Sequence, residues 1–502
     1  MDLDLPRSLA ELLDRAVAAF PTETSLIDGD THWTFSDLAD EVTQRVHFTN
    51  SLVSPGDRVA IISENCPEMV SQFYAGSKAQ VTSVMINARL LPTEQLELLA
   101  RSRATLWLGD DASITALRPL TLEGVTLATW SEAKSPTSEP KPPFGQPFIP
   151  AWLLYTSGTT GKAKGVPLSD ANLIAAAANA GIARQFGAQE VLGLPFPLFH
   201  IAATNLLMAH LHGRPVVLIK GFEPDVVSRL VATHRITALS LAPTMIRRLV
   251  DFQQSSPTDL SALKTIYYGA APITPSLLSE ASQVLGCSFS QGYGMTEAAG
   301  NAVFLDGEAH AKGLHVDSSL LSKAGVAGTL TTLRVVDEQG LDVPPGELGE
   351  ITLAGPQVFS GYEEEEGVSD ATVDAFGGFR TGDLGTVTTD GLLQVVDRKK
   401  DIIITGGENV SSLEVESALS GHPMVKAVAV VSRPHPEWGE EIVAVVVPGD
   451  PFEEIEVRGF ARERLSGFKR PKAYVLVDAL AVNATGKIDK RALRQLVASN
   501  TT

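Results

Sequence analysis

Short apolar runs of strand length alternate with amphipathic runs of helix length along the first part of the chain. Val59–Ile62 has the pattern of a buried strand, and Val81–Ile86 is the next strand-like run. Helical periodicity covers Glu68–Lys78 between them and Thr93–Arg101 after them. Strands that alternate with helices favour parallel pairing, with helices packed on the faces of the sheet. The pattern therefore predicts an α/β fold.

The middle of the chain continues this alternation and then changes. Strands are predicted over Pro215–Ile219, Ile236–Leu241 and Leu263–Tyr268, with a helix over Asp225–Thr233 between the first two. From Gly325 onward, short β runs are separated by glycine and proline turns. This change predicts that the large region of parallel-sheet α/β subdomains also carries a small β-barrel-like or twisted-sheet subdomain.

The charged run Asp397–Asp401 marks a later boundary. Its five consecutive charged residues lie between two apolar runs, so we expect an exposed connection there. The residues after it have a compact α+β pattern. The predicted helices are Leu413–Ser420 and Glu453–Leu465, and the predicted strands lie near Val425–Val431, Glu441–Val447 and Ala473–Val477. We therefore expect a large N-terminal domain over residues 1–397 and a small mobile C-terminal domain over residues 398–502.

The composition restricts the classes of partner. The chain has 502 residues, with 40 Lys and Arg against 59 Asp and Glu, and its formal net charge is −19. An acidic chain is a poor candidate for binding nucleic acid or an anionic membrane, so a local cluster of donors must hold any anionic substrate. The acidic run Glu363–Glu366 is interpreted as a solvated turn. Cys66 and Cys287 have no metal-ligand spacing and are expected to be reduced, inert thiols.

The N-terminal residues are acidic and lack a long apolar segment, so no secretory signal is predicted. No apolar run approaches the roughly 20 residues that span a bilayer. We therefore expect a cytoplasmic protein without a membrane span.

The segment Tyr155–Val166, with the sequence YTSGTTGKAKGV, carries the strongest chemical signal in the chain. Small residues let the backbone approach a ligand, and the N–H groups, hydroxyls and lysines of such a loop suit a polyphosphate. A Walker A loop is excluded, because only two residues separate Gly158 from Gly161 and Ala163 follows Lys162. The alternative is a flexible turn that binds no ligand.

Two further segments could contribute to the same site. In Gln291–Glu297, with the sequence QGYGMTE, glycines flank Tyr293, whose exposed ring could stack on a base. Glu297 could hold a hard cation such as Mg²⁺, which prefers oxygen ligands. The alternative is a common turn before an acidic helix start. His200 follows the rigid apolar run Pro195–Phe199, although a lone histidine is usually structural.

Two polar residues near turns are weaker candidates. Asp383 lies in Thr381–Gly385, where a tight turn could present its carboxylate to ribose hydroxyls, and the alternative is an Asx turn. Lys487 ends the loop Asn483–Lys487, and a lysine on such a loop is usually only solvated.

Together, and in this order along the chain, these motifs resemble those of the adenylate-forming superfamily. That superfamily includes acyl-CoA synthetases, aryl-CoA ligases such as 4-coumarate:CoA ligase, firefly luciferase and non-ribosomal adenylation domains. The resemblance runs from about Leu12 to Leu493, and YTSGTTGKAKGV with the ATGK loop is its most specific part. It implies an AMP-forming ligase that uses ATP, Mg²⁺ and a thiol such as CoA. The acid first attacks the α-phosphorus of ATP, and the thiol then displaces AMP from the acyl-adenylate.

The resemblance implies roles for individual residues. The β- and γ-phosphates of ATP would meet Thr156, Ser157, Gly158, Thr159, Thr160, Gly161, Lys162 and Lys164. Adenine would be enclosed by Gly269, Ala270, Ala271 and Pro272 and by Gln291, Gly292 and Tyr293, and Gly294 would also belong to the ATP site. Thr296 would contact the α-phosphate, Glu297 would hold Mg²⁺, and Asp383 with Arg398 would meet the ribose.

The resemblance assigns the remaining roles to the acyl side and to the C-terminal domain. His200 would border the reacting carboxylate. The acyl pocket would include Ile201, Ala202, Asn205, Met295, Ala298 and Ala299. Lys487 would bridge the carboxylate and the α-phosphate, and Lys400 would be the hinge about which the C-terminal domain rotates between half-reactions. The residues that would bind CoA are Gly406, Gly407 and Lys469.

The substrate is predicted only as a class. Acetyl-CoA synthetases carry a pocket-closing tryptophan where this chain has Gly294. The resemblance therefore implies that Gly294, followed by the small residues Ala298, Ala299 and Gly300, leaves room for an acid larger than acetate. Gln291 does not supply the arginine that similar malonyl-CoA synthetases carry before the Tyr-Gly turn, so a medium or long aliphatic or aryl monocarboxylate is favoured. An oxalate-type or malonate-type dicarboxylate would need a second cation from elsewhere. The alternatives are loading of a carrier-protein phosphopantetheine and a catalytically silent nucleotide-binding protein. A homodimer is compatible with the sequence.

Overall fold

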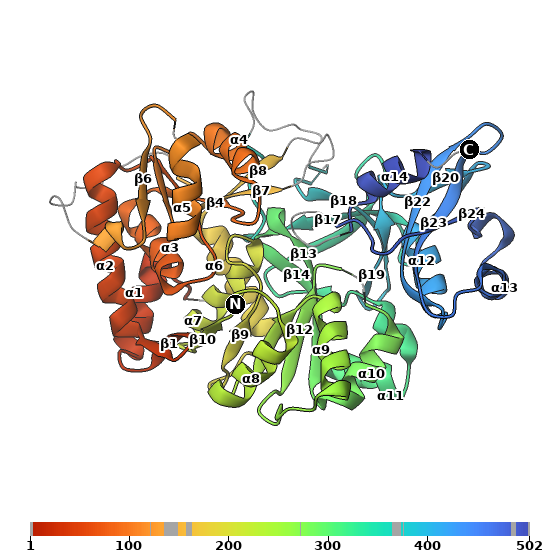
Figure 1. Ribbon diagram of the computed structural model, residues 1–502, viewed down its shortest axis with the longest axis horizontal. Helices are drawn as coiled ribbons and strands as arrows, with labels where there is room; N and C mark the ends of the chain where they lie inside the picture. The colour runs from red at the N-terminus through yellow and green to blue at the C-terminus, as the bar shows by residue number, and fades with distance from the viewer. Residues whose placement is uncertain are drawn as a thin grey trace.

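The structure is a computed structural model that describes residues 4–120, 122–134, 149–156, 163–271, 273–363, 373–374, 376–482 and 488–499. Figure 1 shows a large N-terminal part, coloured from red to cyan, and a small blue C-terminal part at one side of it. Among the described residues, the larger part contains three sheets and the smaller part a fourth. The predicted fold class, α/β with a small C-terminal α+β domain, is confirmed.

The first sheet has the strand order β6-β5-β3-β4-β7-β8, and its neighbours are parallel except for β7 with β8. Successive residues of β3 enter different cores, because Ile61 belongs to one hydrophobic cluster and Ile62 to another. A parallel sheet covered on both faces needs such continuous apolar strands. The strands are β3 (Arg58–Ile62), β4 (Thr82–Ile86), β5 (Leu106–Gly109), β6 (Thr126–Thr129), β7 (Trp152–Thr156) and β8 (Lys164–Leu168), and the helices of this region are α1 (Leu9–Ala19), α2 (Phe35–Leu52), α3 (Pro67–Ala79), α4 (Pro92–Ser102) and α5 (Asp111–Leu117).

The second sheet has the order β15-β14-β13-β12-β11-β9-β10-β1-β2, with a parallel centre from β13 to β1. Its strands are β1 (Thr24–Asp28), β2 (Thr31–Thr34), β9 (Leu192–Leu194), β10 (Val216–Leu218), β11 (Ala238–Leu241), β12 (Thr265–Gly269), β13 (Ser288–Met295), β14 (Gly300–Leu305) and β15 (Val326–Ala327). The helices are α6 (Asp170–Ala183), α7 (Thr204–Leu211), α8 (Pro224–His234), α9 (Pro243–Ser255), α10 (Pro275–Leu285) and α11 (Gly307–His315). Proline opens α8, α9 and α10, where a missing N–H leaves no hydrogen bond unmade.

The third sheet corresponds to the predicted β-rich subdomain. It is antiparallel, in the order β16-β17-β18-β19, and it packs on a cluster that includes Val335, Ile351 and Leu393. Its strands are β16 (Thr332–Val336), β17 (Gly349–Ala354), β18 (Phe379–Val387) and β19 (Leu393–Arg398).

The C-terminal sheet is built around the long hairpin of β22 and β23. One face of it carries the core that α12 and α13 cover, and the other carries a core with Leu493 and Val497 of α14. Its elements are β20 (Ile403–Thr405), β21 (Glu408–Val410), α12 (Ser412–Ser420), β22 (Val425–His435), β23 (Gly439–Pro448), α13 (Glu454–Arg464), β24 (Ala473–Leu476) and α14 (Lys490–Ser499).

The connection between the two parts differs from the prediction. Asp397 and Asp401, at the ends of the charged run, are buried, and only the residues between them are exposed. Asp397 Oδ2 accepts hydrogen bonds from Ser412 N and Ser412 Oγ at the start of α12, and Arg494 Nη2 donates to Asp401 Oδ1 at 2.7 Å. The prediction of a wholly exposed connection was wrong, because these carboxylates are satisfied by partners that lie far away in the sequence.

Candidate active site

The antiparallel hairpin of β7 and β8 frames the glycine-rich loop. Thr156 at the end of β7 pairs with Lys164 at the start of β8. The loop residues between them that were predicted to grip phosphate lie outside the described residues; they are Ser157, Gly158, Thr159, Thr160, Gly161 and Lys162. The strand ends on either side of these residues therefore lie side by side, and β8 is the edge strand of the first sheet.

A polar cluster beside this hairpin contains two predicted site residues, Lys164 and Glu297, and both contact Tyr362. The hydroxyl of Tyr362 donates to Glu297 Oε1 at 2.8 Å, and Lys164 Nζ lies 4.4 Å from the centre of the Tyr362 ring. The backbone of Phe359 also donates to the carbonyl of Glu297 at 2.9 Å. A cation, a phenol and a carboxylate therefore meet at the mouth of the glycine-rich loop. The sequence analysis missed Tyr362, which directly precedes the acidic run.

The donor set of this cluster is compatible with Mg²⁺. Glu297 is half-buried and offers hard carboxylate oxygens. Within the described ranges, no group of three or more His, Cys, Asp or Glu side chains could hold a metal ion by itself. Mg²⁺ is commonly bound by one or two carboxylates together with substrate phosphates, so Glu297 fits a cation that shares its coordination with ATP.

The interpretation of Glu363 as part of a solvated turn was wrong. Glu363 is half-buried, forms an ion pair with Arg58, and donates from its backbone N–H to the carbonyl of Gly165 at 2.8 Å. These contacts fasten the segment that carries Tyr362 to the strand β8. The other residues of the acidic run lie outside the described part of the chain.

A second polar cluster joins the motifs predicted for adenine and ribose. Tyr293 donates from its hydroxyl to Asp383 Oδ2 at 2.8 Å, and Arg398 Nε lies 3.4 Å from Asp383 Oδ1. Asp383 is only 6% exposed. Burial, followed by the charge of Asp383, raises the pKa of Tyr293 well above its ordinary value, so this phenol is a proton donor at neutral pH. Asp383 keeps oxygen lone pairs that could accept bonds from a ribose diol.

The local structure of this cluster differs from the prediction. Gln291, Gly292 and Tyr293 lie in the strand β13 rather than in a turn, and Asp383 lies in the strand β18 rather than in a tight turn. The Tyr293 ring is half-buried, so the expectation of an exposed ring was wrong. Thr296 and Glu297 follow β13 in a short 3₁₀ helix, η4 (Thr296–Ala298).

The packing of neighbouring strands explains why some of the positions predicted to bind adenine are glycines. Gly269, at the end of β12, pairs with Gly292 in the parallel strand β13, and a Cβ at Gly269 would lie 2.4 Å from the Gly292 carbonyl oxygen. A Cβ at Gly294 would lie 1.9 Å from the Gly300 carbonyl oxygen. Gly294 is therefore required by its contact with β14.

The turn after β12 occupies the position where ligands bind parallel sheets. Ala270 and Ala271 are exposed at the carboxyl end of β12, and Ala270 has a positive φ of 69°. Non-glycine residues in the left-handed region are uncommon and store local strain, which is often found at functional sites. Ligands of open α/β sheets bind outside the carboxyl ends of the strands.

His200 is half-buried at the start of the 3₁₀ helix η3 (Ile201–Ala203), with its ring 4.7 Å from that of Phe199. The preceding turn is held by Asn65, a residue that the sequence analysis missed. Asn65 Nδ2 donates to the carbonyls of Phe196 and Ile219, and its Oδ1 accepts from Leu198 N at 2.8 Å. Asn65 lies in the bend that follows strand β3, and nothing in its sequence context signals these distant partners.

The predicted acyl-pocket residues come from two segments that meet. A Cβ at Gly300 would lie 2.9 Å from Thr204 Oγ1, which shows how close the start of β14 lies to the start of α7. Ile201, Ala202 and Met295 are half-buried here, whereas Ala298 and Ala299 are fully buried. Asn205 does not form an open apolar wall: its Oδ1 accepts from Arg184 Nη1 at 2.6 Å.

The predicted residues of the C-terminal part lie apart from these clusters or outside the described residues. Lys400 is exposed. Gly406 and Gly407 form the turn of the β20–β21 hairpin, with φ values of +59° and +84° that suit glycine. Lys469 Nζ binds both carboxylate oxygens of Glu414, at 2.7 and 2.8 Å. Lys487 lies outside the described residues.

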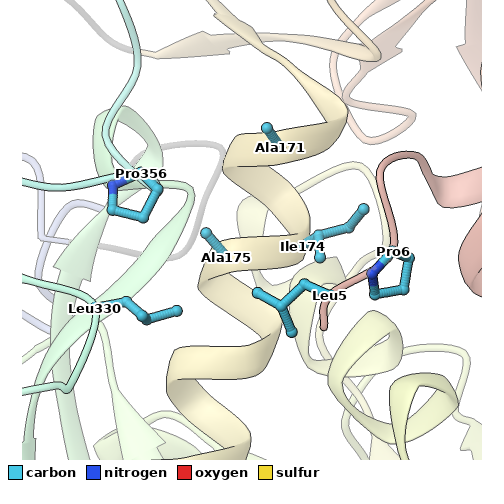
Figure 2. Close-up of a pocket in the computed structure, with 7 residues that line it drawn as sticks. All are labelled: Leu5, Pro6, Ala171, Ile174, Ala175, Leu330 and Pro356. Carbon is cyan, nitrogen blue, oxygen red and sulfur yellow. The ribbon is translucent and has the colours of Figure 1, made fainter. Parts of the chain in front are cut away.

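The cavity drawn in Figure 2 is separate from this chemistry. Its volume is about 300 Å³, and Leu5, Ile174 and Leu330 are among the apolar residues that line it. Figure 2 shows these side chains converging from the N-terminal segment, from α6 and from the region before β16. No predicted site residue lines this cavity, and its walls offer no charged group.

The two cysteines are unreactive at neutral pH, as the sequence predicted, because burial raises the pKa of both Cys66 and Cys287 to about 12.

Comparison with known proteins places this site in a family. The model of the AMP-binding enzymes matches residues 13–363, and that of the AMP-binding enzyme C-terminal domain matches residues 414–487. The chain is 36% identical over 485 residues to the feruloyl-CoA synthase of an Amycolatopsis species, covering 95% of this chain and 96% of the relative. It is 31% identical to the medium/long-chain-fatty-acid–CoA ligase FadD8 of Mycobacterium tuberculosis, covering 97% of this chain and 90% of that one.

Solved structures agree with the sequence matches. The o-succinylbenzoate CoA synthetase (MenE) of Bacillus subtilis, in complex with an acyl-adenylate, superposes with a TM-score of 0.86. It is 29% identical to this chain, and the match covers 96% of this chain and 97% of that one. A further structure of the same enzyme contains ATP and a magnesium ion.

The chain belongs to the AMP-binding enzyme family. The predicted membership of the adenylate-forming superfamily is confirmed, and so is the predicted enzyme class, an AMP-forming acid–CoA ligase that works through an acyl-adenylate. Within the described residues, none of the helices combines the length and the apolar character needed to cross a lipid bilayer.

Proposed function

We propose that this ligase activates an aliphatic or aryl carboxylic acid and transfers the acyl group to the thiol of CoA, with ATP at the carboxyl ends of β12 and β13. The main support is that one short segment reaches both polar clusters. Tyr293, in β13, contacts Asp383, and Glu297, four residues later, contacts Tyr362 beside Lys164. A nucleotide with its ribose at Asp383 and its phosphates near Lys164 would follow this segment.

The proposed roles follow from charge. Lys164, with the glycine-rich loop, would hold the β- and γ-phosphates, and Thr296 would reach the α-phosphate. Glu297 would hold Mg²⁺, which neutralises phosphate charge when it is bound. Two anions must meet in the first half-reaction, so positioning and charge neutralisation are the main contributions that the protein can make.

The acid would bind between η3 and the segment around Met295, with His200 beside its carboxylate. The feruloyl-CoA synthase relative favours an aryl acid, and FadD8 favours an aliphatic one. Both names support a hydrophobic acid larger than acetate. Ile201, Ala202 and Met295 supply partly exposed apolar surface for it.

The C-terminal part would act in both half-reactions. Lys487 would bridge the carboxylate and the α-phosphate during adenylation. Rotation about Lys400 would then bring the Gly406-Gly407 turn and Lys469 toward CoA. For Lys469, this requires release from Glu414, because its ammonium group is already paired in this arrangement. Cytoplasmic localisation and a homodimer remain predictions from the sequence.

A panel of aryl and aliphatic acids tests this proposal. The purified chain is incubated with ATP, Mg²⁺ and each acid, and pyrophosphate exchange and AMP release are measured with and without CoA. We expect exchange with the acid alone and rapid AMP release only when CoA is added. Rapid release with a phosphopantetheine carrier protein but not with CoA would reject CoA as the acceptor, and no exchange with any acid would reject the activity.

A further inference from the structure

Arg184 is a buried arginine with no carboxylate partner among the described residues. The residue follows the last turn of α6 and is only 9% exposed. Among the described residues, no carboxylate lies within salt-bridge distance of it, and its Nε has no hydrogen bond. Arg45, which is also buried, shows the usual arrangement: its Nε and Nη2 both bind Glu41 Oε1, at 2.9 and 2.8 Å. Buried charges are normally paired because their desolvation is costly.

The surroundings of Arg184 compensate its charge only in part. Its Nη1 donates to Asn205 Oδ1 at 2.6 Å and lies 3.9 Å from Met208 Sδ. The guanidinium also lies over the ring of Tyr267 at 4.5 Å and that of Phe304 at 5.8 Å. Burial lowers the pKa of Arg184 to about 10 and raises that of Tyr267 to about 12. At neutral pH the pair is thus a cation over a neutral phenol, and no carboxylate in the described part of the chain forms an ion pair with that cation.

Arg184 lies at the end of the proposed acyl site that is remote from the reaction. Its partner Asn205 is next to Thr204, which approaches Gly300, and Met208, Tyr267 and Ala299 belong to the same hydrophobic cluster. His200, proposed to border the reacting carboxylate, precedes Asn205 by five residues of 3₁₀ and α-helix. That separation corresponds to about 9 Å along the helix axis. An aromatic ring with a short side chain spans such a distance.

We propose that Arg184, oriented by Asn205, binds an oxygen acceptor at the far end of the acid, opposite the carboxylate that is activated. This inference rests on the proposed function. The acceptor is a phenolic oxygen or a second carboxylate, both of which an arginine in an apolar site binds strongly. It supplies the second cation that a dicarboxylate would require and that the Tyr-Gly motif lacks. The substrate class is therefore an aryl or comparably long acid with a distal oxygen.

Three acids that share one phenylpropanoate skeleton test the proposal. They are 3-phenylpropanoic acid and its derivatives with a hydroxyl or a carboxyl group at the para position. AMP release with CoA gives kcat/KM for each acid with the native enzyme, Arg184→Leu and Arg45→Leu. We expect the native enzyme to prefer at least one para-oxygenated acid by about 100-fold, because the unsubstituted acid leaves a buried donor of Arg184 without a hydrogen-bond partner. The better of the two oxygenated acids tells a phenol site from a carboxylate site.

The variants separate recognition from stability. Arg184→Leu is expected to remove the preference and to use the unsubstituted acid at least as well as the native enzyme does. Arg45→Leu, a matched change of a buried arginine elsewhere, is expected to keep the preference even where it lowers stability. Should Arg184→Leu fail to fold, Asn205→Asp places a carboxylate against Arg184, and the same loss of preference is expected.

Two outcomes would overturn the inference. One is a native enzyme that turns over the unsubstituted acid as well as the others; the second is an Arg184→Leu or Asn205→Asp variant that retains the preference or slows all three acids equally. Failure of the proposed function has a different signature, since no acid, neither these three nor any of the aryl and aliphatic panel, would then release AMP with the native enzyme. Turnover of aliphatic acids without turnover of these three would also overturn the inference, but not the proposed function.

Discussion

Tyr293 connects two motifs that lie 90 residues apart in the chain. Its hydroxyl reaches Asp383 although β13 and β18 belong to different sheets. A hydrogen bond to a carboxylate is stronger than one between neutral groups, so this contact orients Asp383 as well as stabilising it. At the residue scale, the site is therefore ordered before any nucleotide binds.

The variant Tyr293→Phe tests this ordering. It removes one hydroxyl and leaves Asp383 without its donor, so we expect the KM for ATP to rise about tenfold while kcat changes little, which corresponds to a loss of roughly 1.4 kcal/mol. Steady-state kinetics with ATP varied checks the effect. Tyr74→Phe is the matched control, because it removes a buried hydroxyl that binds His210 at 2.7 Å away from the site. An equal rise in KM for both variants would contradict the role of Tyr293.

His210 is a second residue whose effect can be measured directly. It is fully buried, with Tyr74 at Nδ1 and the Ser25 carbonyl at Nε2, and burial lowers its pKa to about 4. In the unfolded chain its pKa is about 6.5, so between pH 6.5 and pH 4 only the unfolded state takes up this proton. Stability attributable to His210 is therefore complete above pH 6.5 and is lost as the pH falls to 4, by about 3 kcal/mol.

Urea unfolding at several values between pH 7.5 and pH 4.5 measures this loss. We expect His210→Gln to flatten the decline in unfolding free energy over that interval relative to the native chain. His315→Gln changes an exposed histidine of α11 and is expected to leave the decline unaltered. A native-like slope in His210→Gln would show that other groups cause the acid sensitivity, of which His310, whose pKa burial also lowers, is the first to test.

At the scale of elements, Asp397 joins the last strand of the third sheet to the first helix of the C-terminal part. Besides Ser412, its carboxylate accepts from Ser411 Oγ at 3.2 Å and Leu413 N at 3.3 Å. A carboxylate at a helix N-terminus satisfies N–H groups that have no partner within the helix and interacts favourably with the helix dipole. This contact therefore holds α12 against the end of β19 in the present arrangement of the two parts.

Asp397→Ala should loosen that junction. Loss of the cap is expected to cost about 1–2 kcal/mol locally, so the amides of Ser412 and Leu413 should exchange with solvent roughly ten times faster. Hydrogen exchange followed by mass spectrometry measures this. Asp110→Ala, which removes the cap of α5 at Ser113 N, is the control and should leave exchange in α12 unchanged. Protection of α12 equal to that of the native chain would show that Asp397 does not hold the junction.

The elements also show which features the sequence could predict. Strands such as β3 and helices such as α3 follow from hydrophobic period, because burial on one or both faces leaves a local pattern. The sequence does not show in the same way why a position is glycine. Gly292 and Gly294 suggested a turn, yet they lie in the strand β13. They are glycines there because Asn301 and Gly300 of the neighbouring strand approach too closely for a side chain. The burial of Asp397 and Arg184 could not be predicted from the sequence either, because it depends on partners from distant parts of the chain.

At the scale of the whole molecule, the proposed site residues are distributed over two parts of the chain that a short connection joins. The N-terminal part contains both polar clusters and the proposed acyl site, and Figure 1 shows the C-terminal sheet beside the third sheet. Lys487, which we propose to act in adenylation, lies in the sequence between β24 and α14 of the C-terminal part. An enzyme that must use one site for adenylation and then for thioester formation can alternate by moving the smaller part, with Lys400 in the exposed middle of the connection.

This division predicts that Lys487→Ala separates the two half-reactions. Removing the ammonium group leaves two anions to meet without their bridging cation, so we expect acid-dependent pyrophosphate exchange to fall by about 100-fold or more. Thioester formation from supplied acyl-adenylate and CoA does not need that bridge and should fall by less than about threefold. Lys426→Ala, which removes an exposed lysine of β22 in the same domain, should leave both rates unchanged. An equal loss of both half-reactions in Lys487→Ala would mean that this lysine supports the folded C-terminal domain. Lys164 and the glycine-rich loop would then be the groups that supply the positive charge for adenylation.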